Sequence, residues 1–388
     1  MRALYSVVPA CLLMSVAVNA HATNGNLLTG NGPIASGMGG ASVALPQDTT
    51  VAANNPAGMA FLGNRMDLYG IVIRTETKAT FGSESNKFKS DATVPAPGFG
   101  INYEFAPQWS VGLSVYGAGI SSDYGKKVAP IPGIGDARAS LTVVNTAPTI
   151  TYKPTENLAL GASIIFGVEQ FRAGGIAAVM PTGDVVPLEN HGNSYATGWG
   201  LGLGALWQIN SQFSAGASYF TETKFSKLNN YKNDLLTESD GHLNAPSRYA
   251  VGVAYKPNPD WKIALDYERI LWSEADGFNI PNSFNWRDQD VVRFGVSYQA
   301  SSRWTVRGGY MYANAHLDSE HTLANFYAPG INSEAFTAGA SYLTDNGNSV
   351  NFAFEYNIPR TIDGKGASTG TNIHTNFQVY SVGYTLHF

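Results

Sequence analysis

The sequence predicts an all-β fold: a transmembrane antiparallel β-barrel of about 14 strands with an N-terminal hatch in its lumen. Three features favour this fold, namely an export signal, strand-length segments of alternating apolar and polar residues, and linkers that alternate between short and long. We expect a signal peptide at residues 1–22, the hatch at 23–65 and the barrel at 66–388.

The first 22 residues have the features of a secretory signal. Arg2 precedes an apolar run from Ala3 to Val18, and the run closes on Ala20-His21-Ala22, a small-x-small cleavage pattern. The run is shorter than a membrane-spanning helix and has no stop-transfer flank. Because the one cysteine, Cys11, lies in this segment, the mature chain is expected to have no disulfide and no thiol chemistry.

The composition fits a barrel that is exported to the bacterial outer membrane and crosses it many times. Glycine (42), tyrosine (20) and phenylalanine (19) are abundant, whereas charged residues make up only 14%. Soluble domains average about 25% charged residues. The net charge is −5 and no basic stripe occurs, so nucleic acid is not an expected partner.

The alternation of apolar residues with polar or small ones defines the predicted strands. In the segment 247–256, Tyr249, Val251 and Val253 share one face, while Arg248 and Gly252 lie on the other. The predicted strands lie near 66–77, 94–105, 108–120, 139–152, 157–171, 195–209, 212–225, 247–256, 260–273, 288–299, 302–314, 332–344, 348–359 and 376–388.

The linkers between these segments alternate in length. Short ones such as Ala106-Pro107 and Asn210-Ser211 alternate with long ones such as 172–194 and 226–246. Short periplasmic turns and long extracellular loops are typical of outer-membrane barrels, whereas a soluble β-sandwich has no reason for this asymmetry. The last strand finishes on Phe388, which is similar to the signal read by the barrel assembly machinery.

Residues 23–65 do not alternate and are rich in Gly, Ala, Asn and Ser. Irregular backbone at membrane depth is tolerated only where protein buries it, so this segment is expected inside the lumen as a hatch. In the run 198–207, glycines fall on the inward face while Trp199 and Trp207 face outward, which lets another backbone approach closely.

The hatch carries a recognisable pattern. Ser36-Gly37-Met38-Gly39-Gly40-Ala41, then Asp48, then Asn55-Pro56-Ala57-Gly58-Met59-Ala60, resembles the hatch of the FadL/TodX family of outer-membrane transporters for long-chain fatty acids and other hydrophobic compounds. The resemblance implies passive uptake by hatch rearrangement and lateral release through a kinked third strand. The hatch motif residues are Ser36, Gly37, Gly39, Asn55, Pro56 and Ala57.

The resemblance and the loop composition also suggest where cargo is handled. Gly117 and Gly119 could supply the flexibility of a strand kink. Arg172 is similar in position to a carboxylate-binding region of the family, where a lumen-side cation is expected to meet a cargo carboxylate. Arg248, Arg293 and Arg307 are expected to face inward by alternation and to pair with Asp266, Glu268 or Glu355. Apolar loop residues form the expected capture patch; the substrate-binding candidates beside Arg172 are Ile176, Val179, Met180, Leu235 and Leu236.

Other functions fit the sequence less well. It shows no catalytic constellation, no Gly-x-Ser-x-Gly elbow and no metal-ligand spacing, so neither an enzyme nor a cofactor is expected. The alternative is a general porin for small polar solutes, which needs no hatch. The expected partners are hydrophobic small molecules, outer-membrane lipid and lipopolysaccharide. Fatty acids, alkanes and aromatic hydrocarbons all remain open as cargo.

Overall fold

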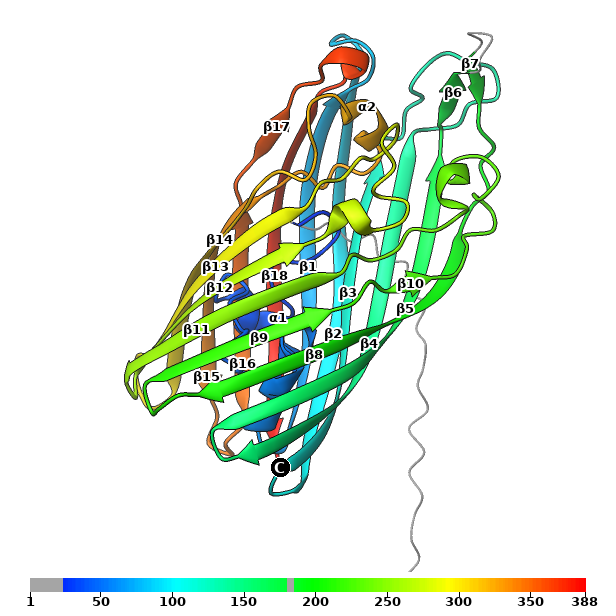
Figure 1. Cartoon of the computed structure of the whole chain (residues 1–388). Helices are drawn as coiled ribbons and strands as arrows, with labels where there is room; N and C mark the ends of the chain where they lie inside the picture. Colours follow the sequence, from blue (N-terminus) through cyan, green and yellow to red (C-terminus); the bar gives the residue numbers. More distant parts are fainter. Residues whose placement is uncertain (1–23, 180–184) are drawn as a thin grey trace, which may run out of the picture.

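A computed structural model describes residues 24–179 and 185–388. The expected signal peptide lies outside the described residues. The described chain forms one tilted barrel with long loops at one end and short turns at the other, and its N-terminal part lies within the ring of strands (Figure 1). We call the two ends the long-loop end and the short-turn end.

Fourteen antiparallel strands form the wall, and pairing of the last with the first closes it, which confirms the predicted fold class. The wall strands are β1 (Arg65–Thr80), β2 (Lys87–Ala106), β3 (Trp109–Asp123), β4 (Arg138–Thr155), β5 (Leu158–Gly174), β8 (Ser194–Gln208), β9 (Phe213–Phe220), β11 (Arg248–Asn258), β12 (Trp261–Ile270), β13 (Gln289–Gln299), β14 (Trp304–Ala313), β15 (Glu334–Leu343), β16 (Ser349–Asn357) and β18 (Ile373–His387).

The strands alternate as the sequence predicts, because one face of the wall is apolar and exposed while the other is packed. Trp199 and Leu203 of β8 are 60% and 52% exposed on the outer face. Gly202 and Gly204, at alternating positions of the same strand, face the lumen. A period of two residues therefore sets the outer surface and the core at once.

One predicted strand is shorter than expected. The segment predicted at 212–225 ends as β9 at Phe220, and a separate strand β10 (Lys224–Phe225) pairs with β8. The chain can fold over β8 here because a Cβ on Gly198 would lie only 2.5 Å from the Lys224 carbonyl oxygen. Three further short strands lie at the long-loop end: β6 (Ala177–Val179), β7 (Val185–Pro187) and β17 (Arg360–Ile362).

The helices of the described chain are all short. Those inside the barrel are α1 (Gly32–Ser36), η1 (Thr49–Ala53) and η2 (Pro56–Phe61), and those in the loops are η3 (Thr237–Ser239), η4 (Trp272–Glu274), α2 (Thr322–Asn325) and η5 (Gly366–Ser368). None of these helices has the length and apolar character needed to cross a membrane.

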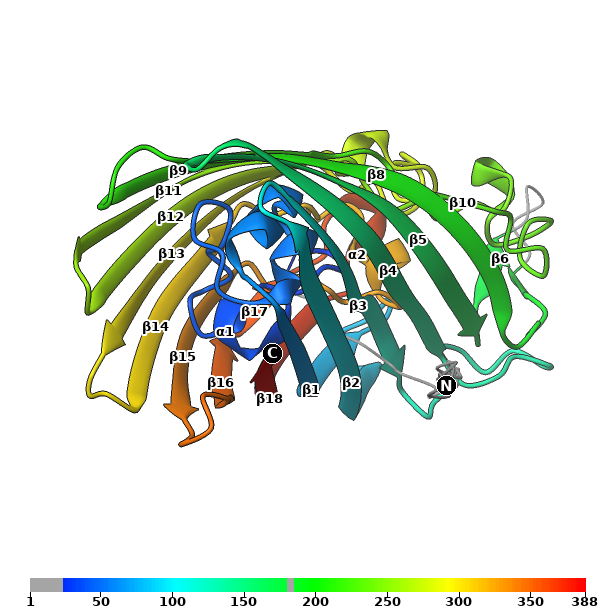
Figure 2. The ribbon, with the colours of Figure 1, turned by 90° about the horizontal axis from the view of Figure 1, so that it is seen from below.

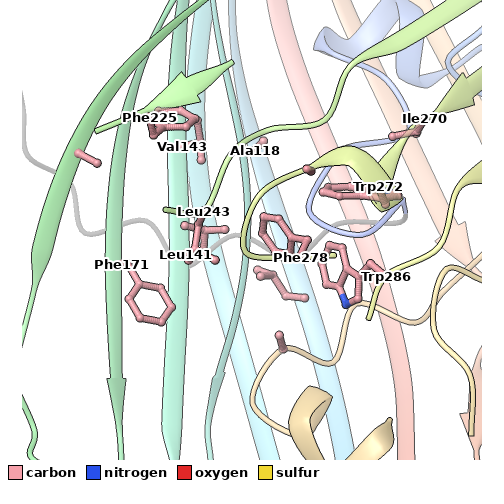
Figure 3. Packing of buried hydrophobic residues seen from close by; sticks show 14 of the residues in the cluster. Ala118, Leu141, Val143, Phe171, Phe225, Leu243, Ile270, Trp272, Phe278 and Trp286 are labelled. Carbon is pink, nitrogen blue, oxygen red and sulfur yellow. The ribbon is translucent and has the colours of Figure 1, made fainter. Parts of the chain in front are cut away.

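The largest apolar cluster joins the barrel wall to the loops. Phe171 and Leu141 come from the wall, and Trp272, Phe278 and Trp286 come from the loop between β12 and β13 (Figure 3). The Trp272 and Trp286 rings meet edge to face at 4.7 Å. The loops at this end are therefore packed structures that extend the core of the barrel.

Candidate functional site

The residues before β1 occupy the lumen. Seen along the barrel from the short-turn end, the segment lies inside the ring of strands (Figure 2). We call residues 24–64 the hatch segment. Because β1 already begins at Arg65, the hatch segment ends one residue earlier than expected.

Glycines in the wall let the hatch segment approach the strands closely. A Cβ on Gly309 would lie 2.2 Å from the Gly39 nitrogen, and one on Gly161 would lie 2.4 Å from the Ala57 nitrogen. Of the run in β8, Gly204 faces Asn55, whereas Gly198 faces β10. Any side chain at Gly309, Gly161 or Gly204 would displace the hatch segment, because these contacts are shorter than van der Waals distance.

The first motif of the hatch segment is fixed by backbone bonds. The Ser36 hydroxyl donates to the Gly30 carbonyl oxygen at 3.1 Å. Gly39 has φ +65°, and its N–H donates to Oγ1 of Thr337 on β15 at 2.9 Å. Gly37 packs against the backbone of Gly339 on the same strand. This part therefore rests on β15 at a distance that only glycine permits.

The Asn55-Pro56-Ala57 motif caps a helix and ties the hatch segment to the wall. The Asn55 Oδ1 accepts from the Ala57 N–H at 3.1 Å, which caps η2, and Pro56 occupies its first position. The Asn55 Nδ2 donates to two carbonyl oxygens, one of Val43 within the hatch segment and one of Ala205 on β8. All side-chain polar atoms of Asn55 are thus used.

Charged side chains of the wall hold the middle of the hatch segment. Asp266 on β12 accepts from the Ser42 and Val43 N–H groups at 2.6 and 2.8 Å. Arg248 on β11 donates to the Ala53 carbonyl oxygen at 2.6 Å and pairs with Glu268, also at 2.6 Å.

The expected pairing of the inward arginines holds for two of the three. Glu268 bridges Arg248 and Arg293, with the second bond also at 2.6 Å. Arg307 instead donates to the Ser341 hydroxyl at 2.7 Å. Glu355 accepts from the Thr29 hydroxyl at 2.8 Å, so it holds the hatch segment without pairing an arginine.

The wall is interrupted between β2 and β3. Their pairing runs from Ala106 and Trp109 only to Phe99 and Val115, although β2 continues to pair with β1 and β3 with β4 up to Asp123. The Asp123 N–H then donates to the Ser90 hydroxyl at 2.9 Å. We call the unpaired stretch between Val115 and Asp123 the β2–β3 gap.

Two prolines explain why β2 does not pair there. Pro95 and Pro97 have no N–H, and the register of β2 with β1 is unbroken through both. Their nitrogens therefore belong on the opposite edge of β2, which faces β3. A strand edge without donors cannot form a ladder.

The hatch segment and β1 reach into the gap. The Gly119 N–H of β3 donates to the Asn26 carbonyl oxygen at 2.8 Å, which satisfies a group that β2 leaves unpaired. The Tyr69 hydroxyl of β1 donates to the Val115 carbonyl oxygen at 3.3 Å. The Tyr69 ring packs directly against Gly98, and a Cβ on Gly98 would lie only 2.2 Å from the Tyr69 side chain.

The two kink candidates lie at this gap, in a strand that is not itself bulged. β3 keeps one register with β4 from Trp109 to Asp123, through Gly117 and Gly119. The interruption is thus on the β2 side of β3. A Cβ on Gly117 would meet only the Val143 carbonyl oxygen within 4 Å, at 3.7 Å.

A cavity of about 490 Å³ lies at the long-loop end, and its lining is mainly apolar. Ile120 of β3, Leu141 of β4 and Phe171 of β5 contribute from the wall, and Phe278 and Tyr327 contribute from the loops. Ile120 also lies within the β2–β3 gap. The cavity and the gap therefore share a strand edge.

The loop candidates are placed differently from one another. Ile176 and Leu235 line the cavity, whereas Leu236 is buried in the largest apolar cluster and does not line the cavity. Met180 and the side chain of Val179 lie outside what the structure describes. Arg172 was expected on the lumen side.

The structure places Arg172 on the outward-facing side of β5, because it falls between Phe171 and Ala173, which both line the cavity. It makes no ion pair with the described residues. The sequence prediction ended this strand at residue 171, whereas β5 continues to Gly174.

Sequence reasoning missed Asn26, Tyr69 and the proline pair. The prolines had a readable signal, since two prolines spaced i and i+2 within a predicted strand leave one edge without donors. Asn26 and Tyr69 had none, because their partners are 93 and 46 residues away in the chain.

A closed barrel with an apolar outer face and a lumen filled by its own N-terminal segment defines a class of outer-membrane transport proteins. Residues 11–387 match the family model described as outer membrane protein transport protein (OMPP1/FadL/TodX). The chain belongs to this family, and it is an outer-membrane protein of a family of transporters rather than enzymes.

Curated relatives are distant. A 47 kDa outer membrane protein of Pasteurella multocida (strain Pm70) is 22% identical over 239 residues, which cover 52% of this chain and 54% of the relative. A long-chain fatty acid transport protein of Escherichia coli (strain K12) is 19% identical over 225 residues, covering 48% and 50%. The chain thus spans about half the length of the curated relatives it matches.

Solved structures share the fold across nearly the whole chain. The Pseudomonas putida toluene transporter TodX has a TM-score of 0.70 at 18% identity, covering 94% of this chain and 100% of TodX. A Pseudomonas aeruginosa FadL homologue has a TM-score of 0.71 at 15% identity, covering 95% and 100%. At this identity the likeness shows the fold alone.

Proposed function

We propose that the protein is a passive channel for hydrophobic compounds across the outer membrane, with its long-loop end outside. One observation carries the proposal: Ile120 lines the apolar cavity and lies at the edge of the β2–β3 gap. A molecule in the cavity therefore needs to move only along this strand to reach an interruption of the wall.

In the proposed sequence of steps, cargo leaves the lipopolysaccharide layer for the cavity, where Ile176 and Leu235 contact it. The hatch segment then shifts and the bond between Asn26 and Gly119 breaks, which frees the edge of β3. Cargo leaves sideways into the membrane. Movement follows the concentration gradient, since apolar surface is transferred between apolar environments throughout.

The class of cargo rests on the apolar lining and on the family. Relatives are named for long-chain fatty acids and for toluene, so fatty acids, alkanes and aromatic hydrocarbons are all candidates. Contact with lipopolysaccharide and recognition of Phe388 by the barrel assembly machinery stay predictions.

The gap can be tested by giving β2 the donors it lacks. In a Pro95→Thr/Pro97→Thr double variant, the two strands can pair beyond Phe99, and uptake of labelled oleate, hexadecane or toluene should lose most of its rate. Pro148→Thr is the matched control, because Pro148 is an exposed proline of β4 in the same wall. Uptake is measured in cells against a strain without the protein.

Two results would contradict the proposal. One is unchanged uptake by the double variant when the barrel is assembled, which would exclude exit through the gap. The other is fast entry of sucrose through the wild-type protein in an osmotic swelling assay, which would favour the general porin.

A further inference from the structure

Glu169 of β5 is a buried carboxyl group that has no partner among the described residues. It is 1% exposed, and neither Oε1 nor Oε2 has a hydrogen-bond partner in residues 24–179 and 185–388. It makes no ion pair within the described chain. By contrast, Asp266, Glu268 and Glu355 in the same barrel are all engaged by the hatch segment or by arginines.

The surroundings of Glu169 are apolar. Its cross-strand neighbours are Val143 on β4 and Ala196 on β8, and Phe171 follows it on the lumen side of β5. Buried polar groups in proteins are nearly always hydrogen-bonded, so an isolated carboxyl group on a lumen wall needs an explanation.

Glu169 lies one row of paired residues below the cavity, at the height of the gap. The row of paired residues Ile120, Leu141 and Phe171 lines the cavity. The next row towards the short-turn end is Ala118, Val143 and Glu169, and Ala118 lies within the gap stretch of β3. Cargo that moves from the cavity along β3 towards the short-turn end therefore comes to the height of Glu169.

Further unpartnered polar atoms lie on the same route. The Asn26 Oδ1 is buried without a partner, and the carbonyl oxygen of the same residue accepts from Gly119, next to Ala118. Both side-chain amide atoms of Asn24 are also buried and have no partner in the part of the chain that the structure describes. A route for purely hydrocarbon cargo has no use for such groups.

We propose that Glu169 is a specificity-determining residue that accepts a hydrogen bond from the hydroxyl group of a neutral hydrophobic cargo, such as a long-chain alkanol. This inference rests on the proposed uptake of hydrophobic compounds and narrows its substrate class. A carboxylate cargo is disfavoured, because its charge would meet a second carboxyl group in apolar surroundings.

A hydroxyl fits this site better than an ammonium group. The C=O of a carboxyl group accepts a hydrogen bond from a hydroxyl whether the group is ionised or protonated. An ammonium group would have to shed its water along an apolar route, and desolvating both members of an ion pair offsets much of their attraction.

The test uses three ligands of equal chain length: radiolabelled 1-dodecanol, dodecane and dodecanoate. Binding is measured to the full-length mature protein in lipid nanodiscs, with binding to empty nanodiscs subtracted. Glu169→Leu should weaken 1-dodecanol binding roughly tenfold, the loss expected for one hydrogen bond to a carboxyl group. Dodecane binding should not change, and dodecanoate binding should strengthen.

Glu169→Gln separates charge from hydrogen bonding and guards against misfolding, because it preserves shape and an acceptor oxygen. This variant should bind 1-dodecanol nearly as well as the wild type does. It should bind dodecanoate more tightly than the wild type does. If Glu169→Leu leaves the preference for 1-dodecanol over dodecane unchanged, the role of Glu169 is refuted while hydrophobic binding stands. If the wild type binds none of the three ligands, the proposed function fails as well.

Discussion

Single residues decide how the hatch segment sits in the barrel. The wall presents glycines where the hatch backbone touches it, and the contacts at Gly309, Gly161 and Gly204 leave no space for a Cβ. Asn55 then fixes the orientation through bonds to both its own helix and Ala205. The fit depends on absent side chains as much as on present ones.

Two neighbouring glycines of β14 test this fit. Gly309→Val should loosen the hatch segment, because the added atoms clash with Gly39, whereas Gly308→Val should be neutral, because a Cβ there meets only the Thr337 carbonyl oxygen at 3.9 Å. Overpacking typically costs about 1–3 kcal/mol.

Sucrose permeability in liposomes and thermal unfolding report the effect. Gly309→Val should raise permeability and lower the unfolding temperature. Equal behaviour of the two variants would show that the close contact does not hold the hatch segment.

At the scale of elements, the loop that follows β14 is locked onto the loop before β13. His316 is 2% exposed, and its ring meets Trp286 edge to face at 4.6 Å. The Arg287 N–H donates to the His316 carbonyl oxygen at 2.8 Å. Burial, followed by the nearby Arg360, lowers the pKa of His316 from 6.5 to about 3.

This packing predicts an acid-sensitive loop. Because the folded pKa of His316 is depressed, its neutral form stabilises the folded loop fully above pH 6.5. That stability declines as the pH falls from 6.5 towards about 3, by up to roughly 1.4 kcal/mol for each pH unit. The near-ultraviolet circular dichroism of the protein, to which the buried Trp286 contributes, should therefore weaken on acidification.

His316→Phe keeps an aromatic ring without a titrating nitrogen. Its dichroism should be flatter between pH 6.5 and pH 4 than that of the wild type. The same acid loss in both proteins would assign the transition to another group.

For the whole molecule, closure of the barrel and filling of the lumen are separable. β1 pairs with β18 from Arg65 to Ala79, and every wall strand pairs with two neighbouring strands, although β2 and β3 pair only up to Phe99 and Val115. A closed sheet satisfies its own backbone groups in lipid. The hatch segment is held mostly by hydrogen bonds that involve side chains, apart from backbone contacts such as the bond between Gly119 and Asn26 in the β2–β3 gap.

Deleting residues 23–45 should therefore leave the barrel assembled while the lumen becomes permeable. We expect sucrose to enter liposomes quickly through the deleted form, and selective uptake of hydrophobic cargo to be lost. A heat-modifiable band on electrophoresis checks assembly. Unchanged selective uptake would show that this part of the hatch segment has no role in transport.

Much of the architecture is local in the sequence and was predictable. Alternation with a period of two residues marked all fourteen wall strands, because one face of each contacts lipid and the other contacts the lumen. The glycines of β8 and the Asn55-Pro56 corner were also visible, since a missing side chain and a fixed φ act at their own positions. The interruption between β2 and β3 and the apolar cavity were less visible.

What the sequence by itself determined is the strand pattern, the closed barrel and a lumen segment built to fit against glycines. Only the tertiary structure decided the side of β3 on which the wall is interrupted, the outward direction of Arg172, the membership of Ile176 and Leu235 in one cavity, and the isolation of Glu169 among the described residues. The reason is physical, because a strand's own residues set which of its faces is apolar. Strand register and loop packing, in contrast, join residues that are far apart in the chain. A shift of one residue along a strand reverses the face to which a side chain points.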